Sequence, residues 1–260
     1  AKDHDGVIPE VFVTNPMVNE GSPYAVFTID GAPGQRVSLD LSDGTATSAD
    51  YTDKIEYSSD GGQTWKRYYR TPSVCLEGSN GTLLVRVPIK QDDVNEPDET
   101  FKLKVTKADG QSVIGTATIQ DDGNGTLFNP DGTVDNTTPK DDDRAVTVTN
   151  PTVNEGSPYA VFTVDGEPGQ QVSLTLTDGT ATSADYGSTL EVSIDGGTTW
   201  TPYTGADVAL NGAAGTLLVR TPIKQDSVDE PDETFQLKVT INGGQTFSRT
   251  LMRLCGWPHG

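Results

Sequence analysis

Apolar and polar residues alternate along several short stretches of the chain. Val37, Leu39 and Leu41 are each separated by one polar residue, and the same period of two recurs over residues 83–89 and 101–105. Side chains that alternate in this way point to opposite faces of a strand, one towards a core and one towards solvent. Asp-Gly and Asn-Gly pairs between these stretches are typical of hairpin turns. No stretch has helical spacing for longer than about one turn, so the pattern predicts an all-β fold.

The chain contains two copies of one sequence unit. Residues 18–28 recur at 153–163 and residues 43–51 recur at 178–186, both at an offset of 135. Residues 83–105 recur at 217–239, where a one-residue deletion reduces the offset to 134. Each copy has room for about seven short strands and shows no helix that could cover a sheet, as in an immunoglobulin-like sandwich. The sequence therefore predicts two tandem immunoglobulin-like Greek-key β-sandwiches.

A Pro-, Gly- and Asp-rich segment separates the two copies. We expect a first sandwich over 1–122, an acidic linker over 123–143, a second sandwich over 144–247, and a non-native or atypical tail over 248–260. Thr250, Met252 and Leu254 nevertheless alternate with other residues in that tail and could take the place of a last strand. Residues 2–5 are similar to the end of the linker, so we expect the chain to be a piece of a longer repeat array.

The composition excludes several classes of function. The chain has 260 residues with 38 acidic and 18 basic side chains, a net charge of −20, which opposes binding to nucleic acid or to an anionic membrane. No apolar run reaches the roughly 18 residues that a membrane-spanning helix needs. The two histidines, His4 and His259, lie in the terminal segments, and no phosphate-binding or nucleophile motif is present. We therefore expect a protein that is not an enzyme.

Acidic residues are densest over residues 92–99, where five of eight side chains are carboxylates. Pro97 interrupts this segment, so it is predicted to be a loop between two strands. Carboxylates packed together repel one another unless a cation or bulk water offsets their charge. A ligand set of oxygens alone, without His or Cys, suits a hard cation and above all Ca²⁺. The alternative interpretation is a solvated acidic turn without a metal.

Four motifs occur in the same order and spacing as in a known family. They are VNEG at 18–21, DGTATSADY at 43–51, QDDVNEPDETF at 91–101 and GTATIQDDG at 115–123. Together they cover nearly all of the first copy. The sequence resembles the Calx-beta and related immunoglobulin-like tandem repeats of large bacterial surface adhesins of the RTX or biofilm type. The resemblance implies Ca²⁺ at one end of the sandwich, where several loops meet the following linker.

The resemblance also implies which residues bind the ion. In the first copy the candidate ligands are Glu20, Asp50, Asp92, Asp93, Glu96, Glu99, Asp121 and Asp122. In the second copy they are Glu155, Asp185, Asp226, Glu230 and Glu233. Gln91 stands where exchanger-type members have a further aspartate, so we expect the first site to be weaker or to hold fewer ions. The second copy lacks the final pair of aspartates, so we expect its site to be impaired. Residues 141–143, three consecutive aspartates, could complete a site at the junction or form a flexible acidic tether.

These observations predict a structural role outside the cell. We expect spacer repeats of a bacterial cell-surface adhesin, stiffened by Ca²⁺ bound at one pole of the sandwich. The expected partners are neighbouring repeats of the same chain, with surface glycans or host and abiotic surfaces as further candidates, and the chain is expected to be monomeric. Three alternatives stay open. One is a glycan- or protein-binding module that uses Trp65 with Tyr57, Tyr68 and Tyr69, and another is an architectural domain that needs no metal. The third, a regulatory calcium sensor as in the exchanger branch of the family, would need a membrane protein around it, and this sequence shows no such segment.

Overall fold

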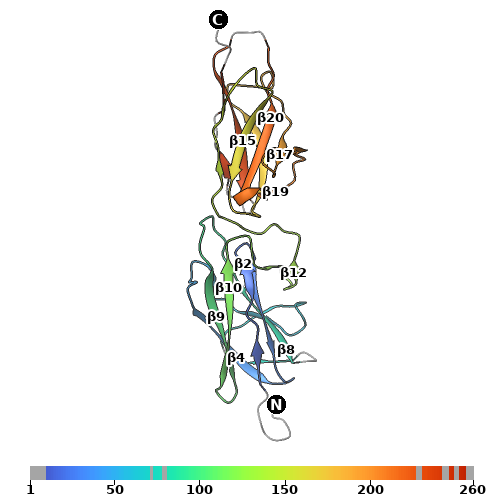
Figure 1. The fold of residues 1–260 in the computed structure, drawn as a ribbon. Coiled ribbons are helices and arrows are strands. Elements are labelled where there is room, and N and C mark those ends of the chain that lie inside the picture. The colour runs from blue at the N-terminus through green and yellow to red at the C-terminus, as the bar shows by residue number, and fades with distance from the viewer. Residues whose placement is uncertain are drawn as a thin grey trace. The chain divides into compact units, whose positions relative to one another are not determined.

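The computed structural model describes residues 10–70, 73–77, 81–226, 230–241, 246–248 and 252–255. The chain divides into two compact units, unit 1 over 1–141 and unit 2 over 142–260 (Figure 1). His4 and His259 lie outside the described residues. The described residues form strands, apart from turns and one short 3₁₀ helix, η1 (Ala213–Gly215). No helix among them has the length and apolar character needed to cross a membrane.

Unit 1 is a sandwich of two five-stranded sheets. The first sheet has the order β1 (Phe12–Val13), β3 (Tyr24–Asp30), β8 (Thr82–Pro88), β5 (Glu56–Ser58), β6 (Lys66–Arg67). The second has the order β2 (Met17–Asn19), β10 (Ser112–Gln120), β9 (Glu99–Lys107), β4 (Arg36–Asp43), β7 (Val74–Cys75). The first edge segment is split between the two sheets, and β2 pairs parallel to β10 while the other pairs are antiparallel. This is the immunoglobulin-like Greek-key arrangement, so the predicted fold class is confirmed.

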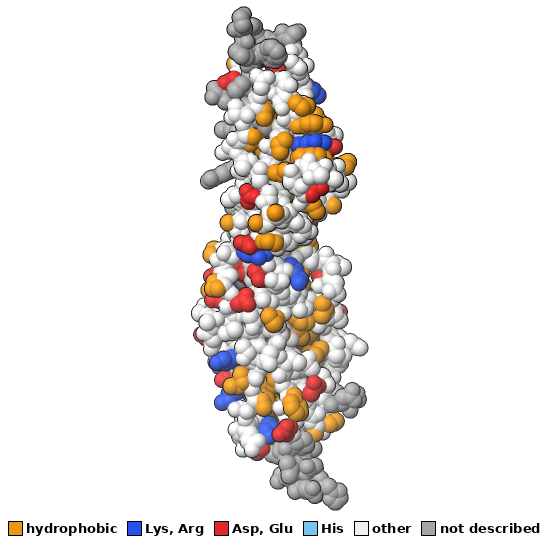
Figure 2. All heavy atoms as spheres, in the orientation of Figure 1, with side chains coloured by type: hydrophobic (Ala, Val, Ile, Leu, Met, Phe, Trp, Pro, Cys, Tyr) orange, Lys and Arg blue, Asp and Glu red, His pale blue; other side chains and the backbone are white. Residues whose placement is uncertain are grey.

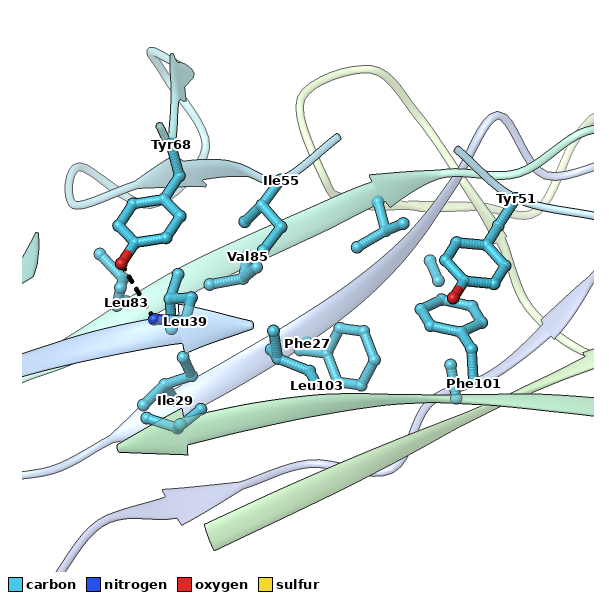
Figure 3. Packing of buried hydrophobic residues seen from close by; sticks show 14 of the residues in the cluster. Phe27, Ile29, Leu39, Tyr51, Ile55, Tyr68, Leu83, Val85, Phe101 and Leu103 are labelled. Carbon is cyan, nitrogen blue, oxygen red and sulfur yellow. Dashed lines mark hydrogen bonds between the residues drawn. The ribbon is translucent and has the colours of Figure 1, made fainter. Parts of the chain in front are cut away.

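The core of unit 1 lies between the sheets and is formed by the apolar positions of the alternating stretches (Figure 3). The rings of Phe27 and Phe101 meet edge to face with centroids 5.9 Å apart, and Tyr51 stacks on Phe101 at 4.3 Å. Tyr68 is also in this core, and its hydroxyl accepts the backbone N–H of Leu39 at 3.2 Å. The packing thus joins both sheets through aromatic contacts, which contribute beyond the burial of their area.

Unit 2 repeats this architecture. Its first sheet has the order β13 (Thr147–Val148), β15 (Tyr159–Asp165), β20 (Thr216–Pro222), β17 (Glu191–Ser193), β18 (Thr201–Pro202). Its second has the order β14 (Thr152–Asn154), β23 (Met252–Cys255), β21 (Glu233–Ile241), β16 (Gln171–Asp178), β19 (Val208–Ala209), and β22 (Thr246–Ser248) also pairs with β21. In this sheet β23 pairs parallel to β14, as β10 does to β2. Part of the segment expected to be an atypical tail therefore completes the sheet.

The linker forms a β-hairpin on unit 1. Its strands are β11 (Leu127–Phe128) and β12 (Val134–Asp135), which pair with each other. The hairpin is attached by its backbone, because the Phe128 N–H donates to Ser22 Oγ at 3.1 Å and the Thr126 N–H donates to the Met17 carbonyl at 2.9 Å. The linker up to Asp141 is therefore an integral part of unit 1.

Candidate metal centres

Two triads of carboxylates lie at one pole of unit 1. Glu20, Asp121 and Asp141 form the first, which we call the buried triad. Residues 50, 96 and 99 (Asp, Glu and Glu) form the second, which we call the loop triad. Within each triad, one oxygen of every side chain lies within 4.8 Å of those of the other two. Figure 2 shows acidic side chains gathered at this end of unit 1.

Strand pairing positions two members of the buried triad. Glu20 directly follows β2 and Asp121 directly follows β10, and these two strands are parallel neighbours. Their carboxylates therefore emerge at the same edge, where the Glu20 N–H also donates to the Gln120 carbonyl at 2.8 Å. The three residues are almost fully buried, with exposed fractions of 5% for Glu20, 3% for Asp121 and 1% for Asp141. Burial of three carboxylates is costly unless a cation or protons offset their charge.

Asn19 fixes the third member. Its side-chain oxygen accepts the Asp141 N–H at 2.7 Å, and its amide nitrogen donates to the Asp141 carbonyl at 2.9 Å. The same nitrogen also donates to the Asn124 carbonyl at 2.9 Å, so Asn19 binds the linker near its beginning and at its end. Sequence reasoning missed this residue, although it is part of the repeated VNEG motif. Its role depends on linker atoms more than a hundred residues away, which the motif does not reveal.

The loop triad is built from three segments. Asp50 belongs to a short turn in which its carboxylate accepts the Thr47 N–H at 2.7 Å. Glu99 opens β9, and Glu96 lies in the acidic loop that precedes this strand. The Glu96 N–H donates to Asp121 Oδ2 at 2.8 Å, which links the two triads. The predicted convergence of loops at one pole is therefore present, as two adjoining groups of carboxylates.

The two triads favour bound protons or a cation. Burial, reinforced by the charges of Asp121 and Asp141, raises the pKa of Glu20 to about 8. Burial and the neighbouring Asp50 raise the pKa of Glu99 to about 7, and burial with Asp50 also raises the pKa of Glu96. Each raised value reports that the ionised form is disfavoured where it stands. A divalent cation would remove this penalty, and oxygen-only ligands suit Ca²⁺, so the residues fit the predicted ion.

Three further predicted ligands lie beside the triads and are not members of them. Asp92 positions Glu20, because its backbone N–H donates to Glu20 Oε1 at 3.1 Å, while its own carboxylate accepts the Val94 N–H. Asp93 is exposed in the same loop. Asp122 accepts hydrogen bonds from the backbone and side chain of Asn124, and so shapes the turn that starts the linker.

Among the described residues of unit 2 there is one such triad, formed by Asp185, Glu230 and Glu233. It corresponds to the loop triad. Burial and the charges of Asp226 and Asp185 raise the pKa of Glu230. Burial and the charges of Asp185 and Glu230 raise the pKa of Glu233. The Asp226 N–H donates to Glu155 Oε1 at 3.2 Å. The Asp92 N–H donates to Glu20 in the same way in unit 1. Within the part of unit 2 that the structure describes, Glu155 belongs to no triad like the buried one. Cys255 takes the place of Gln120 in the sheet register, and the next residue in the sequence is a glycine where unit 1 has Asp121.

The consecutive aspartates of the junction have different surroundings. Asp141 completes the buried triad in unit 1. Asp142 instead belongs to unit 2, where it forms an ion pair with Arg144 at 2.7 Å and accepts a hydrogen bond from Gln170. Residues adjacent in sequence are therefore held by two different sandwiches.

The aromatic residues considered for sugar binding are mostly engaged inside unit 1. Trp65 is half-buried and packs on the guanidinium of Arg86, whose carbon lies 4.2 Å from the ring centroid. Tyr68 is in the core, and Tyr69, with 73% of its surface exposed, lies beside Arg67. Tyr57 is partly buried and packs against the core. The four aromatic side chains are thus in different environments, and this arrangement gives no support to a shared sugar platform.

Residues 56–67 match the BNR/Asp-box repeat family model. They span the β5–β6 hairpin, where Asp60 accepts hydrogen bonds from the hydroxyls of Ser58 and Thr64 at 2.6 and 2.5 Å. These bonds lower the pKa of Asp60 to about 2 and close the turn. Residues 193–200 repeat the same Ser-x-Asp-x-Gly-x-Thr-Trp pattern in unit 2. The match describes this hairpin and covers too little of the chain to assign a family.

No curated protein matches the chain. Solved structures that resemble it include the calcium binding domain CBD12 of CALX1.1, at 15% identity over 95% of this chain and 82% of that one, with a TM-score of 0.35. A tetra-tandem repeat from the extending region of a large adhesion protein matches at 13% identity over 95% and 49%, with a TM-score of 0.28. The C-terminal domain of the Streptococcus agalactiae AgI/II polypeptide BspA matches at 9% over 98% of both chains, with a TM-score of 0.40.

The first two of these structures belong to the groups that the sequence motifs resemble. All three TM-scores are below 0.5, so no conclusion about the function of this chain follows from them. The fold class follows from the strand pairing of the chain itself, and the chemistry follows from its carboxylates.

Proposed function

We propose that the chain is a pair of spacer repeats from a bacterial cell-surface adhesin, and that Ca²⁺ stiffens it at the pole of unit 1. The buried triad would hold one ion and the loop triad a second. Carboxylate oxygens of these six side chains would supply the ligands that calcium prefers. The corresponding triad of unit 2 would bind more weakly, because the sequence of that unit has no counterpart of Asp121.

One observation carries this proposal: Asp141, at the end of the linker, is buried against Glu20 and Asp121 of the sandwich. Asp121 and Asp141 are twenty positions apart in the sequence, so they meet only because the linker returns to the pole. An ion at this triad would tie the linker end to the domain. A flexible acidic tether would leave the same carboxylate in water, where its ionisation costs nothing.

The junction explains how calcium could limit movement between repeats. Asn19 holds Asp141 in unit 1, whereas Arg144 and Gln170 hold Asp142 in unit 2. Without a cation, the repulsion among the three buried carboxylates works against the closed position of Asp141. With calcium the same charges become ligands, and the chain is fixed up to the residue at which unit 2 begins.

The expected size of the effect is modest. Extracellular modules bind calcium with dissociation constants of about 10⁻⁴–10⁻³ M. At ~1 mM free calcium, binding to the folded form alone would stabilise it by about 0.4–1.4 kcal/mol. Such a range suits a site that is filled outside the cell and empty at the much lower calcium concentrations expected inside it.

Calorimetric titration of the full chain with CaCl₂, with MgCl₂ as the comparison ion, tests the binding. We expect saturable heat with calcium, reversal by chelator, and weaker binding of the ion at the buried triad in Asp141→Asn. Asp122→Asn is the matched control, because it removes the same charge from a residue beside the triads. Small-angle scattering with calcium and with chelator then tests the stiffening, which should be absent in Asp141→Asn. A chain that takes up no calcium would be a metal-independent spacer, and the proposal would be wrong.

A further inference from the structure

The two units present the same arginine in the same aromatic setting. In unit 1 the guanidinium of Arg86 lies between the rings of Tyr24 and Trp65, 4.1 and 4.2 Å from their centroids. It also forms an ion pair with Glu56 at 2.6 Å. A guanidinium held between two rings is fixed in direction and keeps further N–H groups for an acceptor.

The equivalent residue of unit 2 is Arg220. It lies between Tyr159 and Trp200 at 4.0 and 4.2 Å, and Glu191 accepts its Nε–H at 2.6 Å. The sheet register confirms the equivalence, because Val161 pairs with Arg220 on β20 as Val26 pairs with Arg86 on β8. The cross-strand face of β15, β20 and β17 therefore copies that of β3, β8 and β5.

In unit 1 the linker hairpin covers this face. The Pro130 carbonyl accepts a hydrogen bond from Arg86, which occupies a guanidinium nitrogen not engaged by Glu56. Gly132, at a φ of +86°, lies so close to Trp65 that an added Cβ would be 2.9 Å from the ring. The backbone of Asp131 also lies against Gly62, where a Cβ would come within 2.0 Å of the Asp131 carbonyl oxygen. The hairpin thus fits the face by main-chain contacts.

In unit 2 no described segment covers the corresponding face. Val161 has 39% of its surface exposed, against 7% for Val26, and Ile194 has 51% exposed. Within the described part of the chain, Glu191 is the only acceptor for Arg220. Gly197 keeps the positive φ of its counterpart, and a Cβ there would meet nothing closer than 3.6 Å. Figure 2 shows hydrophobic side chains with basic ones among them over β15, β20 and β17.

We propose that this face of unit 2, formed by Tyr159, Val161, Trp200 and Arg220, is a docking site for a β-hairpin with the chemistry of residues 127–135. The occupant is a peptide hairpin with an Asn-Pro-Asp-Gly turn. Its proline carbonyl accepts from Arg220, and its glycine lies flat against Trp200. Main-chain recognition of this kind requires the turn geometry and depends little on the side chains of the hairpin.

The test uses the full chain and a synthetic peptide of residues 125–137 that is closed into a ring at its ends. In the full chain the site on unit 1 is already filled by its own hairpin, so only unit 2 is open to the peptide. Binding is followed by NMR through the indole N–H signals of the three tryptophans. We expect a saturable shift of the Trp200 signal while the Trp65 signal stays in place.

Two substitutions decide whether the peptide occupies the proposed face. Val161→Glu places a charge beneath the hairpin at an exposed position, so the fold should be retained and binding weakened about tenfold or more. Ile114→Glu, at another exposed apolar position, on β10 of unit 1, is the matched control and should leave binding unchanged. A peptide carrying Gly132→Ala should also fail to bind. The proposal is overturned if the Trp200 signal does not saturate at millimolar peptide, or if Val161→Glu binds as the parent chain does.

Discussion

Asp141→Asn tests the buried triad most directly, because the substitution keeps the shape of the side chain and removes one of its three carboxyl groups. Asn19 holds Asp141 through its backbone, so the linker end should stay in place. In chelator the variant should be more stable than the parent chain, since the charge of Asp141 helps to raise the pKa of Glu20. In calcium the order should be reversed, because the same carboxylate has become a ligand.

The magnitude follows from linkage. With a dissociation constant of ~10⁻⁴ M, about 10 mM calcium stabilises unit 1 by roughly 2.7 kcal/mol. A tenfold weaker site in the variant would reduce this to about 1.4 kcal/mol. For a unit of 141 residues, the difference corresponds to a change in Tm of ~4 °C.

Thermal unfolding in chelator and in calcium, followed by near-ultraviolet circular dichroism, measures both effects. Asp122→Asn should show the calcium response of the parent chain, because Asp122 shapes a turn outside the triads. An unchanged calcium response in Asp141→Asn would refute the assignment of this residue as a ligand. An equal loss in both variants would show that general charge, and not a site, controls the response.

Three further predictions concern the same pole and linker. The pKa of Glu20 in the folded state is raised from 4.5 to about 8, so the free energy of unfolding in chelator should fall as pH rises across that interval. Saturating calcium should abolish this fall. Denaturant titrations at pH 5 and 8 measure it, and a higher stability at pH 8 would contradict the prediction. Asn19→Ala should lower the free energy of unfolding by about 2–3 kcal/mol and abolish the calcium response, because buried backbone groups lose their partners. Asn154 is exposed at the equivalent position of unit 2, so Asn154→Ala should have little effect. Equal losses of stability in the two variants would contradict the role of Asn19. Gly132→Ala should lower stability more than Gly110→Ala, because both glycines have a positive φ but only Gly132 lies against the Trp65 ring. It should also shift tryptophan emission to the red. Indistinguishable denaturation curves for the two variants would refute the docking of the hairpin.

The fold could be predicted from the sequence because alternation acts locally. Val37 and Leu39 lie in the core as their spacing requires, and two of the alternating tail residues, Met252 and Leu254, belong to β23. The hairpin of the linker could not be predicted in the same way. Its strands have two residues each, and what holds it is main-chain contact with Arg86 and Trp65, which no local pattern encodes.

For the candidate site, the sequence could predict only the end of the sandwich at which the carboxylates gather. The acidic loop and the ends of β2 and β10 indicate that carboxylates converge, but three consecutive aspartates look alike in sequence. The structure distinguishes Asp141, which Asn19 draws into unit 1, from Asp142, which Arg144 draws into unit 2. Asp141 is held by a hydrogen bond between residues more than a hundred positions apart, so its place beside Glu20 and Asp121 requires coordinates.

The difference between the two units also limits what calcium can do in each. An ion at the triad of Asp185, Glu230 and Glu233 would join residues of unit 2 only, so it could raise the stability of that unit without restricting a linker. An ion at the buried triad would join the two ends of a linker, since Asp121 and Asp141 lie on either side of the hairpin. Closing that loop with an ion also favours the docked hairpin, because both depend on the same ordered segment. Calcium, the hairpin and the junction should therefore respond together in unit 1 and independently of the triad in unit 2.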